Sequence, residues 1–550
     1  MDPVIDEPPN PAAESEAEEP APPEPCAPSA GARFFSLLIA LAALGVVLLS
    51  VPSPLFDLDR HSVPKELVMH ITALLALPWL FGGRRPRRPG VIEVLLGTFV
   101  AWSALSTIFA TNHWIALRAF GVGTSAFLVF LCARRVAAEG GGSVALRGLA
   151  LAAIAGAAIG LAQAYGARIE WIAGDRPPGG TFGNRNFLAH FTAISTPLLL
   201  LLATRSRRAA GRAVWLLGLA IAACAIVLTR SRAGWLGFGG GLAVMGTTWL
   251  LTRPETRAAT SPPVRLAAVA LAIGVLFALV VPNRLAWRSS SPYADTLTRL
   301  TDYRSGSGHG RLVQYRNSLR LVGDRPILGV GPGNWFVRYP RVTTRNDPAF
   351  DADDPIPTNP WPSSDWVALL VERGAIAVLL ALAAGAAATL VSLRRIRSTD
   401  TSAGLAAATV PAILVASLVT GAFDAVLMLA PPAFFVAAAV GLLLPATRPV
   451  ARPRLEGRRR LFGGFVLTAV MLAVLLVDAA QLTAIRITRD STRRATVERA
   501  LRFDPGNYRL HLLLAERGPC AQRVPHARAA ARLLPWHPAP REALRACGAR

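Results

Sequence analysis

The polar side chains that could carry chemistry gather in three short segments between long apolar runs. Each segment places arginine, alone or with asparagine, directly before a run of apolar residues or an amphipathic stretch. A guanidinium group binds two phosphate oxygens at once, and the N-terminus of a helix favours an anion. The three segments therefore predict a cationic surface for a phosphate or a diphosphate. Its predicted members are Asn184, Arg185 and Asn186 in the first segment, Arg230 and Arg232 in the second, and Arg311 in the third.

Each segment also has a simpler structural explanation. Asparagine is a common N-cap residue, so Asn184 could cap a helix beside an interfacial arginine. Two arginines at membrane depth cost several kcal/mol unless they are hydrated or paired, and they could extend to lipid headgroups instead. Arg311 follows a glycine-rich stretch, residues 305–310, which is also typical of a flexible linker.

A transfer reaction at such a surface needs a base that accepts the proton of the attacking hydroxyl group. Five titratable residues lie in the segments that join the apolar runs, and their spacing does not distinguish them: His309, Asp365, Asp302, Glu170 and Asp175. Soluble-enzyme motifs such as G-x-x-x-x-G-K-[ST], H-E-x-x-H and G-x-S-x-G are absent from the sequence. The sequence therefore predicts neither a nucleotide-binding loop nor a zinc site.

The elements that position these residues are predicted to be membrane-spanning helices. Apolar residues make up 52% of the chain and charged residues 17%, against roughly 25% charged residues in soluble domains. The apolar runs approach the roughly 20 residues that cross a bilayer, and lipid requires their backbone to be helical. They fall into residues 33–281 and 365–479. Thirteen runs qualify: 33–51, 66–81, 91–109, 117–133, 145–163, 187–203, 213–230, 233–251, 266–281, 365–393, 404–422, 426–446 and 461–479.

Charge alternates along the loops between these runs. Arginine clusters occur in every second loop, so the positive-inside rule places the N-terminus in the cytoplasm and the C-terminus outside it. The formal net charge of +24 does not indicate a nucleic-acid partner, because the arginines alternate with the spans instead of forming one surface. We therefore predict an all-α polytopic membrane protein of about 12–13 transmembrane helices.

Two further regions interrupt or precede the spans. Residues 1–32 are rich in proline, alanine and glutamate and predict a disordered acidic tail in the cytoplasm. Residues 282–364 form a long extracytoplasmic loop, and a loop of this length is usually functional. Within it, the stretch Gly310–Val322 predicts an amphipathic helix with Leu312, Tyr315, Leu319 and Val322 on its apolar side.

Residues 480–550 follow the last span and have the pattern of paired short helices. Two proline turns, at residues 504–508 and 535–538, lie about 31 residues apart, near the 34-residue period of tetratricopeptide repeats. Repeat modules of this type often bind proteins, so this region is a candidate partner surface. It holds two units at most, which predicts docking against the membrane domain. Cys520 and Cys547 both fall in this extracytoplasmic region, where a disulfide is permitted.

Four segments of the chain resemble motifs of the O-antigen ligase and polymerase superfamily of bacterial inner-membrane glycosyltransferases. They occur in the order expected for the family and lie within a core of residues 90–445. Arg185 stands where the first motif usually has proline. The segments are residues 180–189 (G-x-F-x-N-P-N-x-L-A), residues 231–234 (S-R-[GA]), residues 310–334 (G-R…P-[LI]-x-G-x-G-x-[GN]) and residues 364–374 with Ser363 before them (H-[NS]-x-x-L-x-x-x-x-E-x-G).

The resemblance implies that a glycan is transferred from undecaprenyl diphosphate to a lipid or glycan acceptor, without a metal ion or another cofactor. It places this reaction at the periplasmic face of the bacterial inner membrane, as in lipopolysaccharide biosynthesis. By position, Arg232 and Arg311 match the arginines thought to hold the donor diphosphate. Glu372 matches a residue of the helix that follows the catalytic histidine.

The sequence departs from the family at that histidine, because Ser363 stands in its place. A serine hydroxyl cannot act as an imidazole base near neutral pH. Either His309 or Asp365 is expected to substitute, the acceptor needs less activation, or the protein is inactive. Ligation, polymerisation and transfer to protein all fit the pattern. Two alternatives of another class are a lipid-linked-sugar transporter and a non-catalytic assembly protein.

Overall fold

The computed structural model describes residues 27–82, 89–168, 172, 176–287, 289–298, 302, 304, 306–343, 347, 349, 360–397, 401–445 and 456–549. Within these residues the regular secondary structure is helical, and the one extended feature is an isolated bridge between Arg176 and Asn184. The chain is therefore an all-α protein, as the sequence predicts. The predicted acidic tail lies outside the described residues apart from residues 27–32, where the first helix already begins.

Each of the thirteen predicted spans corresponds to a helix. Two of these helices, α8 (Arg232–Leu250) and α15 (Ala430–Leu443), are not themselves long and apolar enough to cross a membrane, because α8 is rich in glycine and α15 has only 14 residues. The multi-pass membrane protein expected from the sequence is confirmed by the other eleven. These are α1 (Ala30–Leu48), α2 (Asp59–Gly82), α3 (Val91–Ile108), α4 (His113–Ala138), α5 (Gly142–Ala164), α6 (Arg185–Arg205), α7 (Ala209–Thr229), α9 (Pro254–Val280), α13 (Asp365–Leu393), α14 (Thr401–Phe423) and α16 (Glu456–Ile487).

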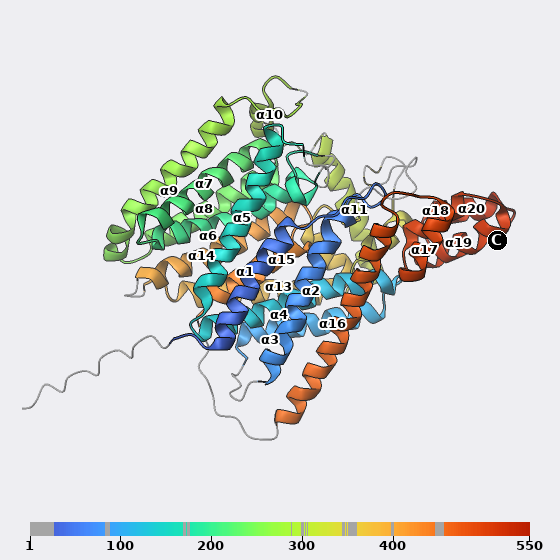
Figure 1. Cartoon of the computed structure of the whole chain (residues 1–550), viewed down its shortest axis with the longest axis horizontal. Coiled ribbons are helices and arrows are strands. Elements are labelled where there is room, and N and C mark those ends of the chain that lie inside the picture. The colour runs from blue at the N-terminus through green and yellow to red at the C-terminus, as the bar shows by residue number, and fades with distance from the viewer. Residues whose placement is uncertain are drawn as a thin grey trace, which may run out of the picture.

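These helices pack into one bundle around a shared apolar core (Figure 1). In this bundle α14 packs against α8 and α6, α1 packs against α5, and α7 packs against α9. Small residues permit the closest approaches. A Cβ atom on Gly148 would lie 2.2 Å from the Cβ of Ala40, and one on Gly274 would lie 2.1 Å from the carbonyl oxygen of Ala220. Close contacts through small residues are the usual means by which membrane helices associate.

One end of the bundle carries the long loop and the C-terminal helices, and we call it the loop end (Figure 1). The loop contains α10 (Pro292–Thr298), α11 (Gly306–Asp324), α12 (Trp335–Arg338) and the 3-10 helix η3 (Tyr339–Arg341). The predicted amphipathic helix is confirmed as α11, but only part of its predicted apolar side is covered, where Val322 packs against the apolar cluster around Trp335. Leu312 and Leu319 are 47% and 53% exposed.

The buried side of α11 is polar because its side chains hold the rest of the loop. The side-chain oxygen of Gln314 accepts the N–H of Ser363 at 2.7 Å. The Oγ of Ser318 accepts the indole N–H of Trp335 at 2.8 Å, and Asn317 is buried beside it. Buried polar groups require such partners. The loop is therefore held by hydrogen bonds to α11 and by Leu321, which is fully buried in one apolar cluster with Trp335.

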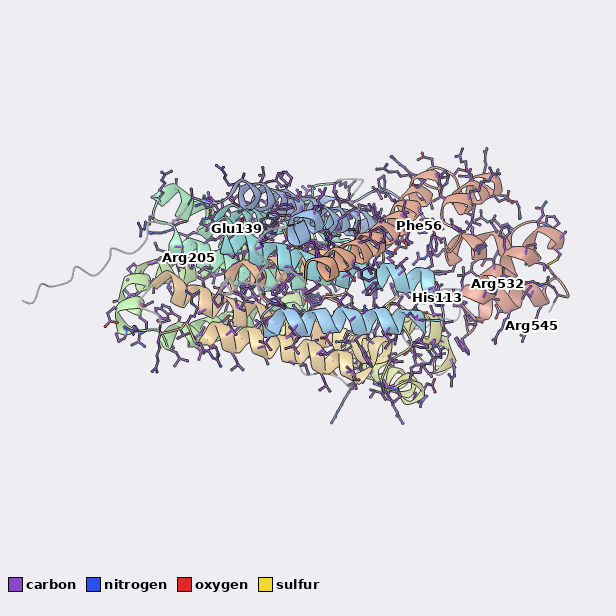
Figure 2. The ribbon with its side chains drawn as sticks, turned by 90° about the horizontal axis from the view of Figure 1, so that it is seen from below. Phe56, His113, Glu139, Arg205, Arg532 and Arg545 are labelled. Carbon is purple, nitrogen blue, oxygen red and sulfur yellow. A yellow bond between two sulfur atoms is a disulfide. The ribbon has the colours of Figure 1, made fainter. Side chains whose placement is uncertain are left out.

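Beyond the membrane helices, α16 leads into four short helices at the loop end (Figure 2). These are α17 (Arg494–Phe503), α18 (Tyr508–Glu516), α19 (Cys520–Leu533) and α20 (Pro538–Arg545), which we call the C-terminal bundle. The two proline turns fall between α17 and α18 and between α19 and α20. Cys520 and Cys547 form a disulfide, with their Cα atoms 5.4 Å apart. The likeness to tetratricopeptide repeats stays a prediction.

The C-terminal bundle docks against the membrane domain, as its small size predicts. Leu512 of α18 packs in one apolar cluster with Trp335 of the long loop. Leu510 packs in another with Phe56, which precedes α2. The two clusters fix the bundle to both the loop and the start of the helical domain, so residues of the bundle can contribute to a site at the loop end.

Candidate active site

The first predicted segment is a tight turn that leads into α6. Gly183 adopts a left-handed backbone with a φ of 71°, which glycine permits without strain. The Nζ of Lys65 donates to the carbonyl oxygen of Thr181 at 2.5 Å, which fixes the turn to α2. Asn184 caps α6, because its side chain accepts the N–H of Asn186 at 2.9 Å. The capping role that the sequence offers as the simpler explanation for Asn184 is therefore confirmed.

Arg185 and Arg230 meet on one aromatic ring. Arg230 ends α7 in a left-handed conformation with a φ of 52°, and its Nε donates to Thr296 at 3.0 Å. Its guanidinium lies 4.7 Å from the ring centroid of Trp287, and that of Arg185 lies 4.9 Å from the same ring. Cation–π contacts of this kind contribute about 0.5–2 kcal/mol each. Trp287 thus holds two like charges together at the loop end.

Arg232 connects the turn between α7 and α8 to the start of α11. It is the first residue of α8, directly after the N-cap residue Ser231. Its guanidinium donates to the carbonyl oxygen of Asp302 at 3.3 Å and to the Oγ of Ser307 at 2.9 Å. Arg311 follows Ser307 by four residues, which places both on the same side of α11. The structure therefore brings the second and third predicted segments together.

Two titratable residues that the sequence analysis did not single out lie beside these arginines. His190 of α6 is 1% exposed, and neither of its ring nitrogens makes a hydrogen bond. It lies within range of the charges of both Asp424 and Arg311. Asp424 lies between α14 and α15, and its Oδ2 accepts the Nδ2–H of Asn186 at 3.4 Å. An imidazole is therefore placed within range of Arg311 and of an acid that contacts Asn186.

A weak sequence signal for these two residues exists. His190 lies one helical turn after Asn186, so both occupy the same side of α6. Asp424 is a single acidic residue between two apolar runs, at the same predicted side of the membrane as the arginines. Such intramembrane or interfacial charges are commonly functional.

Asp365, a predicted candidate base, anchors the backbone between α14 and α15. Its Oδ1 accepts the N–H of Val426 and its Oδ2 accepts the N–H of Leu427, both at 2.8 Å. Its own N–H donates to the carbonyl oxygen of Asp424 at 3.2 Å. Both carboxylate oxygens of Asp365 are therefore used to fix the turn that carries Asp424, which supports a positioning role.

Ser363 occupies a position that several elements hold in place. Its N–H donates to Gln314, and its carbonyl oxygen accepts the hydroxyl of Tyr315. The same hydroxyl lies 3.0 Å from the carbonyl oxygen of Ala422, near the end of α14. Residue 363 is thereby held between α11 and the chain segment that precedes Asp424.

Glu372 belongs to the support of the long loop and is paired with Arg373 at 3.4 Å. It is fully buried, and its carbonyl oxygen and its carboxylate accept the N–H groups of Gly331 at 2.9 Å and Trp335 at 3.4 Å. The next turn of α13 is broken at Gly374, which has a φ of 77°. A Cβ atom there would lie 1.9 Å from the carbonyl oxygen of Ile327. Glycines in the motif of residues 310–334 and in the motif of residues 364–374 thus let the loop backbone pack closely against α13.

The remaining candidate bases are less favourably placed. His309 is exposed on α11, and Asp302 contributes a carbonyl oxygen to Arg232. Glu170 and Asp175 lie outside the described residues. Of the acids and histidines considered, Asp424 contacts Asn186, and His190 lies within range of the charges of Asp424 and Arg311.

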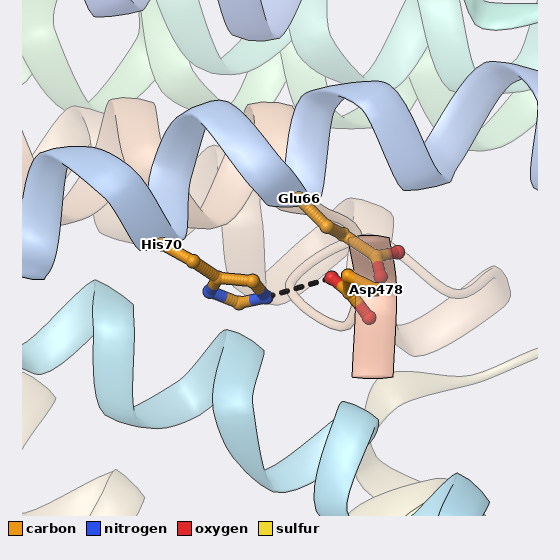
Figure 3. Close-up of side chains that lie close together, drawn as sticks. All are labelled: Glu66, His70 and Asp478. Carbon is orange, nitrogen blue, oxygen red and sulfur yellow. Dashed lines mark ion pairs between the residues drawn. The ribbon is translucent and has the colours of Figure 1, made fainter. Parts of the chain in front are cut away.

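A second polar cluster joins α2, α4 and α16 inside the bundle (Figure 3). The Nε2 of His70 lies 3.0 Å from the Oδ2 of Asp478, and Glu66 lies beside them. Among the described residues, these three form the one group close enough to hold a metal ion, with ligand atoms within 4.8 Å. However, Arg118 binds Glu66 at 2.7 Å and Asp59 at 2.8 Å. A metal ion would face this guanidinium, so the cluster fits a structural connection between helices better.

A cavity of about 910 Å³ lies between α3, α4, α13 and α15. This volume is within the range of about 300–1,000 Å³ that is typical of ligand sites. Its deeper walls are mainly apolar, and Gly123 and Gly385 face it with no atom within 4 Å of an added Cβ. At the loop end it is lined by Trp361, whose ring lies 6.3 Å from that of Phe187. Since Phe187 follows Asn186, the cavity adjoins the arginine segments.

Comparison with known families gives one match, which covers part of this site. The O-antigen ligase family model (Wzy_C) matches residues 217–382, a stretch that runs from α7 into α13. It contains Arg230, Arg232 and Arg311, whereas Arg185 lies before it. No curated protein matches the chain. The chain is thus a multi-pass membrane protein whose residues 217–382 are similar to the O-antigen ligase family.

Proposed function

We propose that this protein transfers a glycan from undecaprenyl diphosphate to the hydroxyl group of an acceptor at the loop end. The observation that carries this proposal is the convergence of three distant chain segments on one cationic region. Arg185 begins α6, Arg232 begins α8 and contacts the start of α11, and Arg311 lies one turn further along α11. The family match supports a transferase of the ligase or polymerase type.

The donor diphosphate is the group that this region suits best. Arg185 and Arg232 are the first residues of their helices, where the positive end of the helix dipole adds to their own charge. Arg230 shares Trp287 with Arg185 and so brings a further guanidinium to the same place. An anion with two phosphate groups would relieve the repulsion between these like charges. Guanidinium groups also bind phosphate oxygens bidentately.

The reaction itself is a displacement at the first carbon of the donor sugar. The acceptor oxygen forms a bond to that carbon, and the bond from the carbon to the diphosphate oxygen breaks. The diphosphate leaves with the bonding electrons and stays on its lipid, while the arginines stabilise the charge that develops on it. The proton of the acceptor hydroxyl passes to a base of the protein.

Asp424 is the base that the structure supports best, in place of the missing histidine. Its carboxylate is half-buried beside Asn186, and the backbone that carries it is fixed by Asp365. His190 lies within range of the charge of Asp424 and has no hydrogen-bond partner of its own. It can therefore stabilise Asp424 when that carboxylate is charged or has taken up a proton. Ser363 and the exposed His309 remain the alternatives that the sequence offers.

The proposal places the loop end at the periplasmic face of a bacterial inner membrane, because the arginine clusters of the opposite loops would face the cytoplasm. The N-terminus is then cytoplasmic and the C-terminus periplasmic. The donor lipid and the surrounding membrane lipids are the expected partners. The acceptor is a lipid or a glycan, with transfer to a protein as the further case.

Complementation in a bacterium that lacks its own O-antigen ligase tests this function. Surface lipopolysaccharide is resolved on a gel, and long-chain bands report transfer. The expected result is restored bands with the wild-type chain and none with Arg232→Ala or Arg311→Ala at equal membrane abundance. Arg320→Ala is the matched control, because Arg320 is exposed on α11 outside the three segments. Near-wild-type bands with both test variants would reject the proposed donor site.

Failure of the wild-type chain to restore bands is resolved by a second assay. Purified protein is then given a lipid-linked oligosaccharide alone, and polymerised product is sought by mass spectrometry. Product in this assay would identify a polymerase. No product in either assay, with the protein correctly inserted, would contradict the transferase proposal.

A further inference from the structure

Two histidines of the C-terminal bundle face each other across neighbouring helices. His511 lies on α18 and His526 lies on α19, and their Nδ1 atoms are 3.2 Å apart. The ring centroids are 5.4 Å apart, and the ring planes are tilted by 39°. Both side chains are half-buried, so solvent reaches the pair. Imidazole nitrogen is a common ligand of transition-metal ions, and two such nitrogens that meet are a candidate metal site.

The spacing of the two nitrogens suits a tetrahedral ion. A bond from zinc to an imidazole nitrogen is about 2.0–2.1 Å long, so two ligand nitrogens at a tetrahedral angle lie about 3.3–3.4 Å apart. The observed 3.2 Å between the Nδ1 atoms is close to that value. The two helices also pack against each other and share an apolar cluster through Ala515 and Ala527. An ion therefore needs a small rotation of the rings and no movement of the helices.

The proton of His511 is on the nitrogen that faces away from His526. The Nε2 of His511 lies 3.1 Å from the carbonyl oxygen of Pro505. A carbonyl oxygen only accepts, so we assign the proton to Nε2, and Nδ1 presents a lone pair. Histidines that bind metals usually donate their second ring N–H to a backbone carbonyl or a carboxylate in this way. The Nδ1–H of His526 donates to the lone pair of His511. A metal ion takes the place of that proton, which moves through solvent to the Nε2 of His526.

The charges around the pair keep both rings neutral. Burial lowers the pKa of His511 and of His526 from 6.5, and Arg532 and Arg494 respectively lower it further. Neutral imidazole is the form that binds a metal ion. The charge of Arg494 is offset by Glu498, which it binds at 2.8 Å and which also lies within range of His526. Arg532 is exposed to solvent, which screens its charge.

A metal ion here would complete the connections within the C-terminal bundle. The bundle consists of four helices of 8 to 14 residues, and domains this small commonly depend on disulfides or metal ions. The disulfide ties α19 to Cys547, just after α20. The histidine pair lies between α18 and α19, and its Pro505 partner belongs to the turn that packs against α4. In that turn a Cβ atom on Gly506 would lie 2.3 Å from the ring of Trp114.

We propose that His511 and His526 bind one Zn²⁺ ion, or a divalent transition-metal ion of similar chemistry, through their Nδ1 atoms. Water completes the coordination, because both side chains are partly exposed. The three-ligand group around His70 differs, since the guanidinium of Arg118 already binds there. The ion joins α18 to α19 and stabilises the turn that docks on α4. This site is separate from the proposed glycan transfer and does not depend on it.

Calorimetric titration of the full chain with Zn²⁺ tests the proposal. The protein is purified in detergent with an affinity tag that contains no histidine, and is first treated with a chelator. The expected result is one Zn²⁺ ion per chain, with Mg²⁺ not bound because it prefers oxygen ligands. His511→Ala and His526→Ala should each weaken Zn²⁺ binding at least about tenfold. His113→Ala is the matched control and should bind like the wild type, because His113 is exposed on α4 outside the bundle (Figure 2).

Two measurements on the wild type do not depend on how the variants fold. Pulsed electron paramagnetic resonance with Cu²⁺ as the probe counts the bound imidazole rings, and two are expected. Hydrogen exchange reports the connection between the helices. Zn²⁺ at 100 times its dissociation constant should slow exchange in α18 and α19 by up to about 100-fold, with exchange in α11 unchanged.

Three results would overturn the proposal. Absence of Zn²⁺ binding by the wild-type chain would remove the site. Binding of wild-type strength in the double variant His511→Ala/His526→Ala would place the ion elsewhere, such as at the cluster around His70. A Cu²⁺ spectrum with a single imidazole would show that the two histidines do not share one ion.

Discussion

Gly374→Ala tests how the glycine-rich loop is held in α13. Gly374 interrupts the helix with a φ of 77° and a ψ of 178°, a conformation that is open to glycine and strained for alanine. The break admits the loop backbone, whose Pro326 carbonyl oxygen accepts the N–H of Ala375 at 2.9 Å. An added Cβ would lie 1.9 Å from the carbonyl oxygen of Ile327, so the loop must move away.

The size of the effect follows from these contacts. Alanine in this backbone region costs on the order of 1–3 kcal/mol in strain. Displacement of the loop also breaks the hydrogen bond to Ala375 and the one from Gly331 to Glu372, at about 1 kcal/mol each. The total loss of stability is about 3–5 kcal/mol. Because the same loop connects to α11 and its arginine, glycan transfer is expected to fall with it.

Thermal unfolding in detergent and hydrogen exchange of residues 326–334 measure this loss. Gly385→Ala is the matched control on the same helix, since its added methyl group meets no atom within 4 Å. That control is expected to be neutral or stabilising by up to about 1 kcal/mol. If Gly374→Ala unfolds and exchanges like Gly385→Ala, close packing of the loop backbone against α13 at Gly374 is refuted.

Three further predictions concern titratable residues. Burial raises the pKa of Asp504 from 3.8 to about 6, so the folded carboxyl binds its proton more tightly than the unfolded one. The stability of the turn between α17 and α18 should therefore fall by up to about 3 kcal/mol as pH rises from about 4 to about 6. Hydrogen exchange of α18 should show this dependence on pH in the wild type and not in Asp504→Asn. Asp424→Asn should lower the rate of transfer by about 100-fold or more with the melting temperature unchanged, whereas His309→Ala should retain activity. Asp365→Asn replaces one of two backbone acceptors, so it should lower both the melting temperature and the rate of transfer.

The membrane fold is largely predictable from the sequence because its signal is local. Runs of about 20 apolar residues must be helical in lipid, and each of the thirteen predicted runs contains a helix. The positions of Arg185 and Arg232 at helix starts follow from local patterns as well. The pairing of Arg185 with Arg230 on Trp287 does not, because it joins segments that are far apart in the chain.

The parts that the sequence analysis missed depend on contacts between elements. Leu312 and Leu319 of α11 were expected to be buried, but the loop needs the polar side chains of Gln314 and Ser318 as partners, so these two leucines are exposed. Asp365 appears as a candidate base until its two backbone partners are known. The contact of Asp424 with Asn186 and the cavity both form only when α6, α13 and α15 are packed together.

Direct binding of the donor tests the central claim. Wild-type protein in nanodiscs is titrated with undecaprenyl diphosphate, and the dissociation constant is compared with those of Arg232→Ala, Arg311→Ala and the exposed control Arg320→Ala. Loss of a charge-assisted contact costs about 1.5–3 kcal/mol, so each test variant should bind about 10–100-fold more weakly while the control binds like the wild type. Wild-type affinity in both test variants would contradict the assignment of the arginine region to the donor diphosphate.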